Sequence, residues 1–403
     1  MPYRPDRTLI GVQQAGALLA MHGEPIGRVE RVRLDDADGR VLAEDLVATH
    51  DVPPFARALM DGYAVRAADT SEASAQRPVT LRLLETIYTG RAPTAVVDTG
   101  TCAGIATGAP VPEGADAVVM VEQTSAEGAT IHIRQQAAAR QNVGRAGSDL
   151  EAGEVALREG TLLTPAKLGV IAALGLTDIR VYARPRVAIL STGDEIVAPG
   201  GVLGPAQIFD SNTTALAAAV RAHGGEPVVA PRVGDDRAAL ASAFERCLDE
   251  DLVLFSGGTS VGERDFLLEI IERAGTVVFE GLKLKPGRPT VFAMARGRPV
   301  FGMPGNPVSC LTNAYLLVAP MLRRMARLPP PSARTVLATL TAAVASPAGR
   351  HQIYPVRLEA SQAVPVFKGS GEITSLARAD GYFEIPEDVS TLDAGTVVEV
   401  TLF

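Results

Sequence analysis

The stretch VAILSTGDE at residues 187–195 decides the fold, because an apolar run of strand length passes directly into small, hydroxyl and acidic residues. A second stretch of the same design, LVLFSGGTSVG, occupies residues 252–262. From Arg186 to about Arg327, such runs alternate with helical patterns. This alternation is typical of a parallel sheet covered by helices. The sequence therefore predicts a doubly wound, mostly parallel α/β domain at its centre.

The elements of this central domain follow from the apolar runs and from capping residues at the helix ends. We expect one helix to begin at Asp210-Ser211-Asn212 and another at Asp235-Asp236, and we expect Pro304-Gly305-Asn306-Pro307 to open a last, long helix. A further helix is expected over residues 266–273. The expected strands are 187–191, 228–233, 252–255, 277–284, 291–293 and 300–302.

The rest of the chain has a different pattern of apolar and polar residues. The 403 residues allow two to four domains at roughly 150 residues each. Residues 51–149 read as an inserted β-rich domain, and the helical candidates at 11–21 and 164–174 lie on either side of it. A proline-rich linker at 329–331 precedes alternating strands, which indicates a terminal β-barrel-like domain. The predicted domains are 1–50 with 150–183, then 51–149, 184–328 and 329–403.

Composition excludes several classes of protein. The formal net charge is −8 and no basic face is evident, so we expect no nucleic-acid partner. The three cysteines are far apart, which argues against a disulfide framework or a structural zinc site. No apolar run approaches the ~18 residues of a membrane span, and Gln13 and Gln14 interrupt the only candidate signal core. We therefore expect a soluble cytoplasmic protein with no membrane partner.

Polar loops follow five of the predicted strands. In an open parallel sheet, ligands bind at the carboxyl ends of the strands, where loops and helix N-termini present their N–H groups. Glycines allow close approach of the backbone, and hydroxyls add donors, which suits a phosphate or a pterin-like ring. The alternative is that each loop is only a tight turn. The residues concerned are Ser191, Gly193, Asp194, Glu195, Asp235, Gly257, Gly258, Thr259, Ser260, Gly262, Lys285, Arg288, Pro304, Gly305 and Asn306.

Three carboxylates at the same edge, Glu195, Asp235 and Asp265, indicate a metal site. Acidic groups facing an anionic ligand would repel it unless a divalent cation lay between them, and Mg²⁺ is the usual ion in such sites. Metal-assisted phosphoryl or phosphoanhydride chemistry follows from this combination. Helix N-capping is an alternative explanation for Asp235 and Asp265.

Other catalytic patterns fit poorly. Residues 258–262 match G-x-S-x-G, the nucleophile elbow of serine hydrolases, but the only histidine after Ser260 is His351, beyond the proline linker. Glu263, Arg264 and Asp265 also stand where an elbow would lead into an apolar helix. No G-x-x-x-x-G-K-[ST] loop occurs, and the five histidines are scattered without metal-ligand spacing.

Six strings, taken in order, resemble one family. They are MDGYAV at 60–65, TGAPVPEGAD at 107–116, STGDE at 191–195, SGGTSVG at 256–262, KPGRP at 285–289 and PGNPVS at 304–309. In this order they resemble the molybdopterin molybdenumtransferases of molybdenum-cofactor synthesis, and the resemblance covers nearly the whole chain.

The resemblance implies a homodimer of four-domain subunits in which a β-domain of the partner subunit closes the cleft. It implies metal-dependent cleavage of adenylyl-molybdopterin with release of AMP, coupled to insertion of molybdate into the dithiolene. The molybdopterin adenylyltransferase and acceptor molybdoenzymes are implied as further partners. A hypothesis of another class is a non-catalytic scaffold of the same fold that binds molybdopterin or a peptide.

The resemblance also assigns residues. It implies an acidic cleft of Asp61, Asp149, Glu195, Asp235 and Asp265, with Thr107 beside it, and the four aspartates as catalytic residues. Pterin and phosphates would be held by Asp210, Ser211, Asn212 and the glycine loop at 257–262, and Pro304, Gly305, Asn306 and Ser309 would also bind substrate. Lys285, Arg288, Arg350 and Ser370 would hold the molybdate oxyanion. Arg288 stands where the family frequently has lysine, and a planar guanidinium is not equivalent to a point charge.

Overall fold

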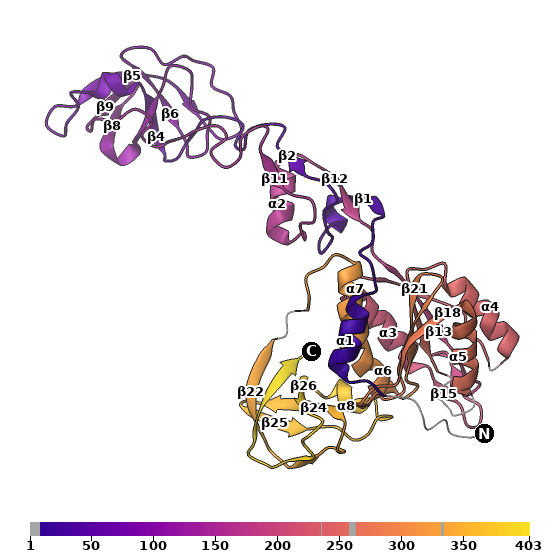
Figure 1. The fold of residues 1–403 in the computed structure, drawn as a ribbon. Coiled ribbons are helices and arrows are strands. Elements are labelled where there is room, and N and C mark those ends of the chain that lie inside the picture. Colours follow the sequence, from indigo (N-terminus) through magenta and orange to yellow (C-terminus); the bar gives the residue numbers. More distant parts are fainter. Residues whose placement is uncertain (1–8, 235, 258–262, 332–333) are drawn as a thin grey trace. The chain divides into compact units, whose positions relative to one another are not determined.

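The computed structural model describes residues 9–234, 236–257, 263–331 and 334–403, without the side chains of 263–266 (Figure 1). Contacts between Cα atoms divide the chain into two compact units. Unit 1 combines residues 1–30 with residues 182–403, and unit 2 comprises residues 31–181. The division into four domains stays a prediction.

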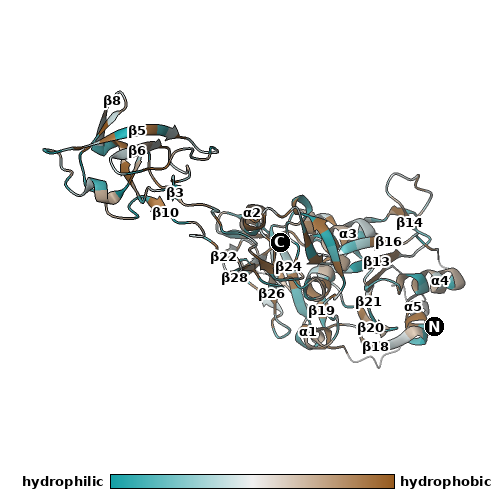
Figure 2. Ribbon diagram, turned by 90° about the horizontal axis from the view of Figure 1, so that it is seen from above, coloured by the Kyte–Doolittle hydropathy of each residue, from teal (hydrophilic) through white to brown (hydrophobic). Residues whose placement is uncertain are grey.

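A six-stranded sheet forms the centre of unit 1, in the order β16-β13-β17-β21-β20-β18. Five of the six strands run in one direction and β20 alone runs in the opposite direction, which confirms the expected mostly parallel sheet. Alternate apolar side chains of β13 and β17 pack on opposite faces of the sheet. Figure 2 shows the position of the sheet, with each residue coloured by hydropathy. The bounds are β13 Arg186–Ser191, β16 Glu226–Val229, β17 Leu252–Ser256, β18 Gly275–Glu280, β20 Val291–Ala295 and β21 Arg298–Met303.

Helices cover both faces of this sheet, as a doubly wound fold requires. On one face, α1, α3, α6 and α7 bury residues such as Leu19, Leu216, Cys310 and Met321. On the other face, α4 and α5 bury residues such as Phe244 and Ile271. The bounds are α1 Val12–Ala20, α3 Ser211–Ala222, α4 Arg237–Cys247, α5 Glu263–Ala274, α6 Pro307–Asn313 and α7 Ala319–Met325.

The helix starts agree with the capping residues in the sequence. Asp210 caps α3 by accepting a bond from Thr213 N–H, and Asp236 caps α4 by accepting one from Ala239 N–H. The long last helix is interrupted by a π-helical turn, Ala314–Val318, between α6 and α7. Pro320 lies at the start of α7, and a proline has no N–H for the regular helical bond, which accounts for the irregular turn before it.

Two expected strands are wrong in their extent. The strand expected at 277–284 ends at Glu280, because Gly281 turns the chain with a φ of +87° and donates its N–H to Thr290 O. Residues Leu284–Lys285 then form a separate strand, β19, in another sheet. The strand expected at 228–233 is β16, which ends at Val229, and Val233 makes only an isolated bridge to Thr192. Pro231 lacks the N–H that a continuing ladder needs.

The second sheet of unit 1 is a barrel built mainly from the C-terminal residues, as predicted. Its order is β19-β24-β25-β22-β28-β26, and a further β24–β26 pairing closes it around Val356, Phe383 and Val400. A two-stranded ribbon, β23 (Val344–Ala345) with β27 (Thr391–Leu392), and the short helix α8 (Thr374–Ala377) complete it. The barrel strands are β22 Thr335–Leu340, β24 His351–Glu359, β25 Gln362–Pro365, β26 Gly381–Ile385 and β28 Val397–Leu402.

Unit 2 is largely β-structure, in agreement with the texture of residues 51–149. Its six-stranded sheet has the order β7-β4-β6-β5-β9-β8 and buries apolar clusters that include Ile131 and Ile105. A separate small core forms around Ile171 of α2 (Pro165–Ala173). The strands are β4 Gly62–Val65, β5 Val79–Ile87, β6 Thr101–Ile105, β7 Ala117–Met120, β8 Thr124–Glu127 and β9 Thr130–Ile133. Three two-stranded sheets accompany the six-stranded sheet: β1 Val29–Arg33 with β12 Asp178–Tyr182, β2 Leu46–Val47 with β11 Val155–Leu157, and β3 Arg57–Ala58 with β10 Val143–Gly144. Another two-stranded sheet, β14 Ile196–Val197 with β15 Ile208–Phe209, belongs to unit 1.

Candidate functional site

The ends of strands β13 and β17 lie side by side at the carboxyl edge of the central sheet. Ser191 pairs with Ser256, and Thr192 N–H donates to Ser256 O at 3.1 Å. Gly257 has a φ of +111°, and a Cβ there would lie 2.2 Å from Thr192 O. The close approach of the two strand ends therefore requires glycine at position 257.

Charged side chains gather beside this edge. The carboxylate of Glu195 folds over Gly193, where a Cβ would lie 2.5 Å from Glu195 Oε2. Arg232 Nη1 donates to Gly193 O at 2.9 Å. Asp194 lies against Gly234, with its Oδ1 2.7 Å from the position of a Cβ on that glycine. The sequence did not single out Arg232, which lies within the second expected strand, 228–233; a cation near the end of an apolar run was the available signal.

Asn212 joins the loops after two different strands. Its Nδ2 donates to Ser256 Oγ at 3.0 Å and to Gly305 O at 2.8 Å. It belongs to the first turn of α3, next to Ser211, and Asp210 fixes that turn with bonds from Thr213 N–H and Oγ1. The helix N-terminus is thereby held between the end of β17 and the loop that contains Pro304, where its N–H groups favour an anion.

The loop from Lys285 to Arg288 is fixed by a hydrogen bond from Asn313, a residue that the sequence did not indicate. Asn313 Nδ2 donates to Gly287 O at 2.9 Å, and Thr290 Oγ1 donates to the same oxygen at 2.9 Å. Gly287 has a φ of +115°, and Asn313 fills the space that a Cβ would need. The sequence shows Asn313 only as one of several polar residues in this helix, and its burial becomes evident from the structure. Arg288 itself is exposed.

The C-terminal barrel contributes residues to the same region of unit 1. Strand β19 pairs with β24 so that Leu284 lies opposite His351 and Lys285 opposite Gln352, and Arg350 directly precedes β24. Asn306 Nδ2 donates to Ser370 Oγ at 2.9 Å, and Val308 N–H donates to Ser370 O at 3.1 Å. Ser309 is buried on α6 just beyond this contact. The structure thus brings Lys285 close to the start of β24 and Ser370 to the Pro304–Ser309 loop.

Asp61 and Thr107 form a separate, directly bonded pair in unit 2. Asp61 Oδ1 accepts bonds from Thr107 N–H at 2.7 Å and from Thr107 Oγ1 at 2.9 Å. The pairing of β4 with β6, which sets Gly62 opposite Ile105, positions both residues. These two bonds lower the pKa of the exposed Asp61 carboxyl below its ordinary value, the backbone bond most. Asp149 is exposed in the same unit, and its N–H donates to Val52 O.

Part of the predicted site lies outside the described residues. Asp235, Gly258, Thr259, Ser260 and Gly262 are in this group, and the side chain of Asp265 on α5 is not described either. Of the three predicted metal ligands, the structure therefore describes the side chain of Glu195 alone. Among the described residues, no three His, Cys, Asp or Glu side chains converge on one point. The oxygens of an exposed carboxylate such as Glu195 still suit Mg²⁺, which is commonly held by one or two carboxylates and the substrate's phosphates.

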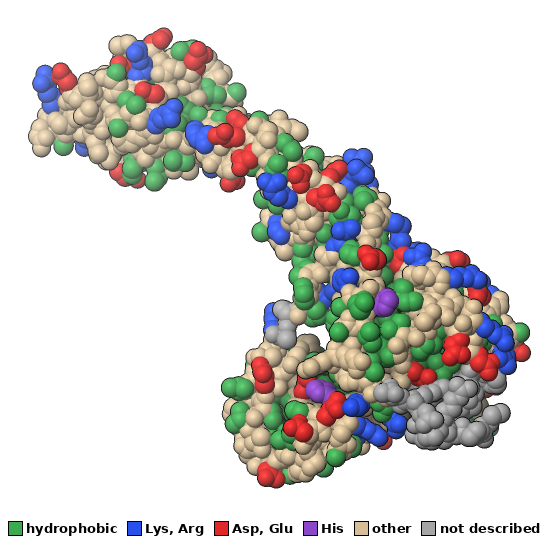
Figure 3. Space-filling model, in the orientation of Figure 1, with side chains coloured by type: hydrophobic (Ala, Val, Ile, Leu, Met, Phe, Trp, Pro, Cys, Tyr) green, Lys and Arg blue, Asp and Glu red, His purple; other side chains and the backbone are tan. Residues whose placement is uncertain are grey.

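The described surface carries both signs of charge. Figure 3 shows acidic and basic side chains interspersed over the visible face of each unit, in keeping with the formal net charge of −8. Within the described ranges, no helix has the length and apolar character needed to cross a bilayer.

Three family models match successive parts of the chain. The region around the site, residues 188–324, matches a probable molybdopterin binding domain. Residues 10–175 match the MoeA N-terminal region, domains I and II, and residues 338–403 match the MoeA C-terminal region, domain IV. The matches define a protein with a molybdopterin-type α/β domain between MoeA-type flanking regions.

Whole-chain relatives agree with this assignment. Molybdopterin molybdenumtransferase 2 of Mycobacterium tuberculosis is 40% identical over 379 residues, which is 92% of this chain and 94% of the relative. The Haemophilus influenzae molybdopterin molybdenumtransferase is 32% identical over 93% of this chain and 94% of its own length. A solved molybdopterin biosynthesis MoeA protein of Pyrococcus horikoshii OT3 has a TM-score of 0.81 at 33% identity, covering 98% of this chain and 100% of that one. The chain belongs to the molybdopterin molybdenumtransferase (MoeA) family, a family of transferases.

Proposed function

We propose that this chain inserts molybdate into adenylyl-molybdopterin and releases AMP. The observation that carries the proposal is the double hydrogen bond of Asn212, to Ser256 Oγ and Gly305 O. It fixes the N-terminus of α3 between two strand-end loops, and the second of these loops contacts Ser370 of the barrel through Asn306. Donors for a phosphate and residues for an oxyanion therefore lie on connected segments of unit 1.

The phosphates and the pterin would bind at the edge formed by β13, β17 and α3. Free N–H groups at a helix N-terminus and in glycine-rich turns are aimed at anions. Gly257 and Gly305 are partly exposed at this edge and have no side chain to cover the backbone, whereas Gly193 is buried beneath the Glu195 carboxylate. Ser191, Ser211 and the undescribed loop 258–262 complete this proposed surface.

A divalent cation, Mg²⁺, would be held at this edge by Glu195, with Asp235 and Asp265 as further proposed ligands. When bound, it would neutralise charge on the phosphate oxygens during pyrophosphate cleavage. Glu195 suits the role because its exposed carboxylate lies against Gly193 next to the strand end. Asp61 and Asp149 are proposed to act on the same reaction, and the two bonds from Thr107 hold the Asp61 carboxylate in place and lower its pKa.

The molybdate oxyanion would bind between Lys285, Arg288, Arg350 and Ser370. A compact tetrahedral dianion is best held by converging cations and a hydroxyl. The pairing of β19 with β24 places Lys285 next to the residues that follow Arg350, and Asn306 holds the Ser370 hydroxyl. The region therefore supplies the charge and the donors that this substrate requires.

The test is release of AMP from adenylyl-molybdopterin by the purified chain with Mg²⁺ and molybdate. We expect turnover that requires both additions, and slower turnover in a Glu195→Gln variant. Binding of adenylyl-molybdopterin without AMP release, whichever divalent metal is added, would contradict the proposal and favour a non-catalytic scaffold. We also propose a cytoplasmic homodimer that exchanges substrate with an adenylyltransferase and with acceptor enzymes. Sedimentation equilibrium at the mass of two chains would support the dimer.

A further inference from the structure

Gln352 is a buried amide whose side chain has no polar partner among the described residues. It is the second residue of β24 and is fully buried at 0% exposure. Neither its Nε2 nor its Oε1 has a hydrogen-bond partner among the residues that the structure describes. An amide buried without hydrogen bonds destabilises the fold by about 1–3 kcal/mol. Native proteins seldom keep such a group unless something binds to it.

The register of the sheet sets Gln352 directly beside Lys285. The two residues are partners in the parallel β19–β24 pair. Neighbouring residues in paired strands project to the same side of a sheet, so both side chains leave β19 and β24 on one face.

The aromatic contacts support this placement for Lys285 and for Tyr354, which shares the face of Gln352 on β24. Lys285 Nζ lies 6.0 Å from the centre of the Phe367 ring. Tyr354, two residues after Gln352 and on its side of β24, packs edge-on against the same ring at 5.6 Å. The ammonium, the two rings and the buried amide are therefore next to one another in unit 1.

The two unpartnered atoms of Gln352 have opposite requirements. Nε2 is a donor and needs an acceptor, whereas Oε1 is an acceptor and needs a donor. A cation alone would satisfy only Oε1, and an anion alone would satisfy only Nε2. A water molecule satisfies both, and so does Lys285 together with an oxyanion; the adjacent ammonium favours the anion.

We propose that Gln352 is a further residue of the oxyanion site, donating from Nε2 to an oxygen of a tetrahedral dianion and accepting at Oε1 from the Lys285 ammonium. This inference rests on the proposed function for the identity of the dianion, molybdate. The Gln352 amide would add an uncharged hydrogen-bond donor to the proposed cations of the site. Its oxygen would also hold the Lys285 ammonium in position.

The test is molybdate binding to the full chain, measured by equilibrium dialysis without any pterin substrate. Gln352→Met keeps the size of the side chain and removes both hydrogen-bonding groups. We expect it to weaken molybdate binding about tenfold, the value of one charge-assisted hydrogen bond. Gln362→Leu is the matched control, because Gln362 is an exposed glutamine on the neighbouring strand β25, and its affinity should equal that of the unmodified chain.

Several outcomes would overturn the proposal. Unchanged molybdate affinity in Gln352→Met, with a raised melting temperature, would show that the amide is only an unfavourable buried group. If Gln352→Met does not fold, a crystal structure of the unmodified chain with molybdate decides the matter. A molybdate oxygen within about 3.2 Å of Nε2 supports the proposal, and an amide turned away from the anion refutes it.

The outcomes separate this inference from the proposed function. Molybdate-dependent AMP release that is the same in Gln352→Met and the unmodified chain would refute the role of Gln352 and leave the function intact. Loss of molybdate binding in Gln352→Met, in a chain that never releases AMP, would refute the function and support the role of Gln352.

Discussion

The side-chain amide of Asn306 donates to the hydroxyl of Ser370 at 2.9 Å, which joins a strand-end loop of the α/β sheet to the C-terminal barrel. The backbone bond from Val308 N–H to Ser370 O supports the same contact. Ser370 is therefore fixed by two bonds. Its hydroxyl stands at a defined place relative to the Pro304–Ser309 loop.

Replacing Asn212 with alanine should both destabilise unit 1 and slow the reaction. The change removes two hydrogen bonds and leaves the Ser256 hydroxyl, on a buried residue, with one partner fewer. We expect a loss of about 1–3 kcal/mol of unfolding free energy and at least a tenfold fall in AMP release, measured by urea unfolding and by the AMP assay. Thr214→Ala, at an exposed position on the same helix, is the control. Full activity in Asn212→Ala would contradict the proposed role of this edge.

The Thr107→Val variant should raise the pKa of Asp61. The hydroxyl bond is lost and the stronger effect, the bond from Thr107 N–H, remains, so the pKa should rise while staying below the ordinary 3.8. Because the lowered pKa belongs to the folded state, the stability it contributes is present above pH 3.8 and is lost as the pH falls through the folded pKa. A carbon-detected NMR titration of the Asp61 carboxyl measures the change, and an unshifted titration would show that the hydroxyl bond is not formed in solution.

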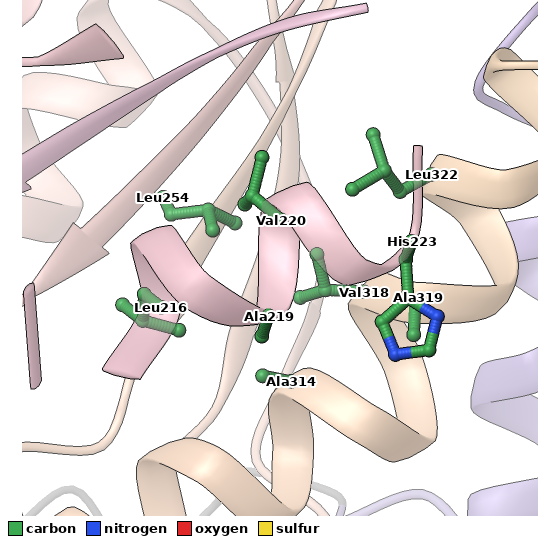
Figure 4. A pocket seen from close by; sticks show the side chains of 9 residues that line it. All are labelled: Leu216, Ala219, Val220, His223, Leu254, Ala314, Val318, Ala319 and Leu322. Atoms are coloured by element: carbon green, nitrogen blue, oxygen red, sulfur yellow. The ribbon is translucent and has the colours of Figure 1, made fainter. Parts of the chain in front are cut away.

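His223 should make the fold sensitive to mild acid. Its ring closes a small pocket whose other side chains are apolar, next to Val318, Ala319 and Leu322 (Figure 4), and its Nδ1 is buried without a hydrogen-bond partner in the described part of the chain. Burial, and then the nearby Arg323, lower its pKa below 6.5. The folded state therefore binds fewer protons than the unfolded state, so stability is complete above pH 6.5 and declines as the pH falls from 6.5 toward the folded pKa.

The variant His223→Leu should remove this dependence. Urea unfolding at pH 7.5, 6.5 and 5.5 measures it, and we expect a flatter profile for His223→Leu than for the unmodified chain. His50→Leu changes an exposed histidine and should leave the slope as it was. Equal slopes in all three proteins would mean that another group controls the acid response.

Gly257→Ala should be strongly destabilising, by about 2 kcal/mol or more, because the added Cβ meets Thr192 O and the residue has a φ of +111°. Gly16→Ala is the contrasting substitution in the same unit. That glycine is exposed on α1 with open space around it, so alanine there should stabilise the helix by about 0.5–1 kcal/mol. Thermal unfolding of the two variants measures both effects. A tolerated alanine at 257 would mean that the two strand ends can separate.

The sequence predicted the central sheet well, because its buried strands are continuous apolar runs and its helices carry caps such as Asp210 and Asp236. It did not predict that Leu284–Lys285 joins the barrel. Strand pairing between distant segments depends on the three-dimensional path of the chain. A strand of two residues is also too short to show the alternation of apolar and polar residues by which strands are predicted. Asn313 and Gln352 escaped notice for a related reason, since each stands beside other polar residues, Thr312 and His351, and the sequence does not show which side chain is buried. Arg232 was visible only as a single cation within the expected strand 228–233, which in the structure ends at Val229.

Strand β19 gives the central domain and the barrel a shared stretch of main chain. Rotation of the central domain relative to the barrel would have to break the hydrogen bonds between β19 and β24. Lys285 and the start of β24 therefore move together. A chain cut before residue 329 would lose the partner of β19, and an isolated barrel would expose the edge that β19 covers. Neither half can be studied as a faithful substitute for the intact polypeptide.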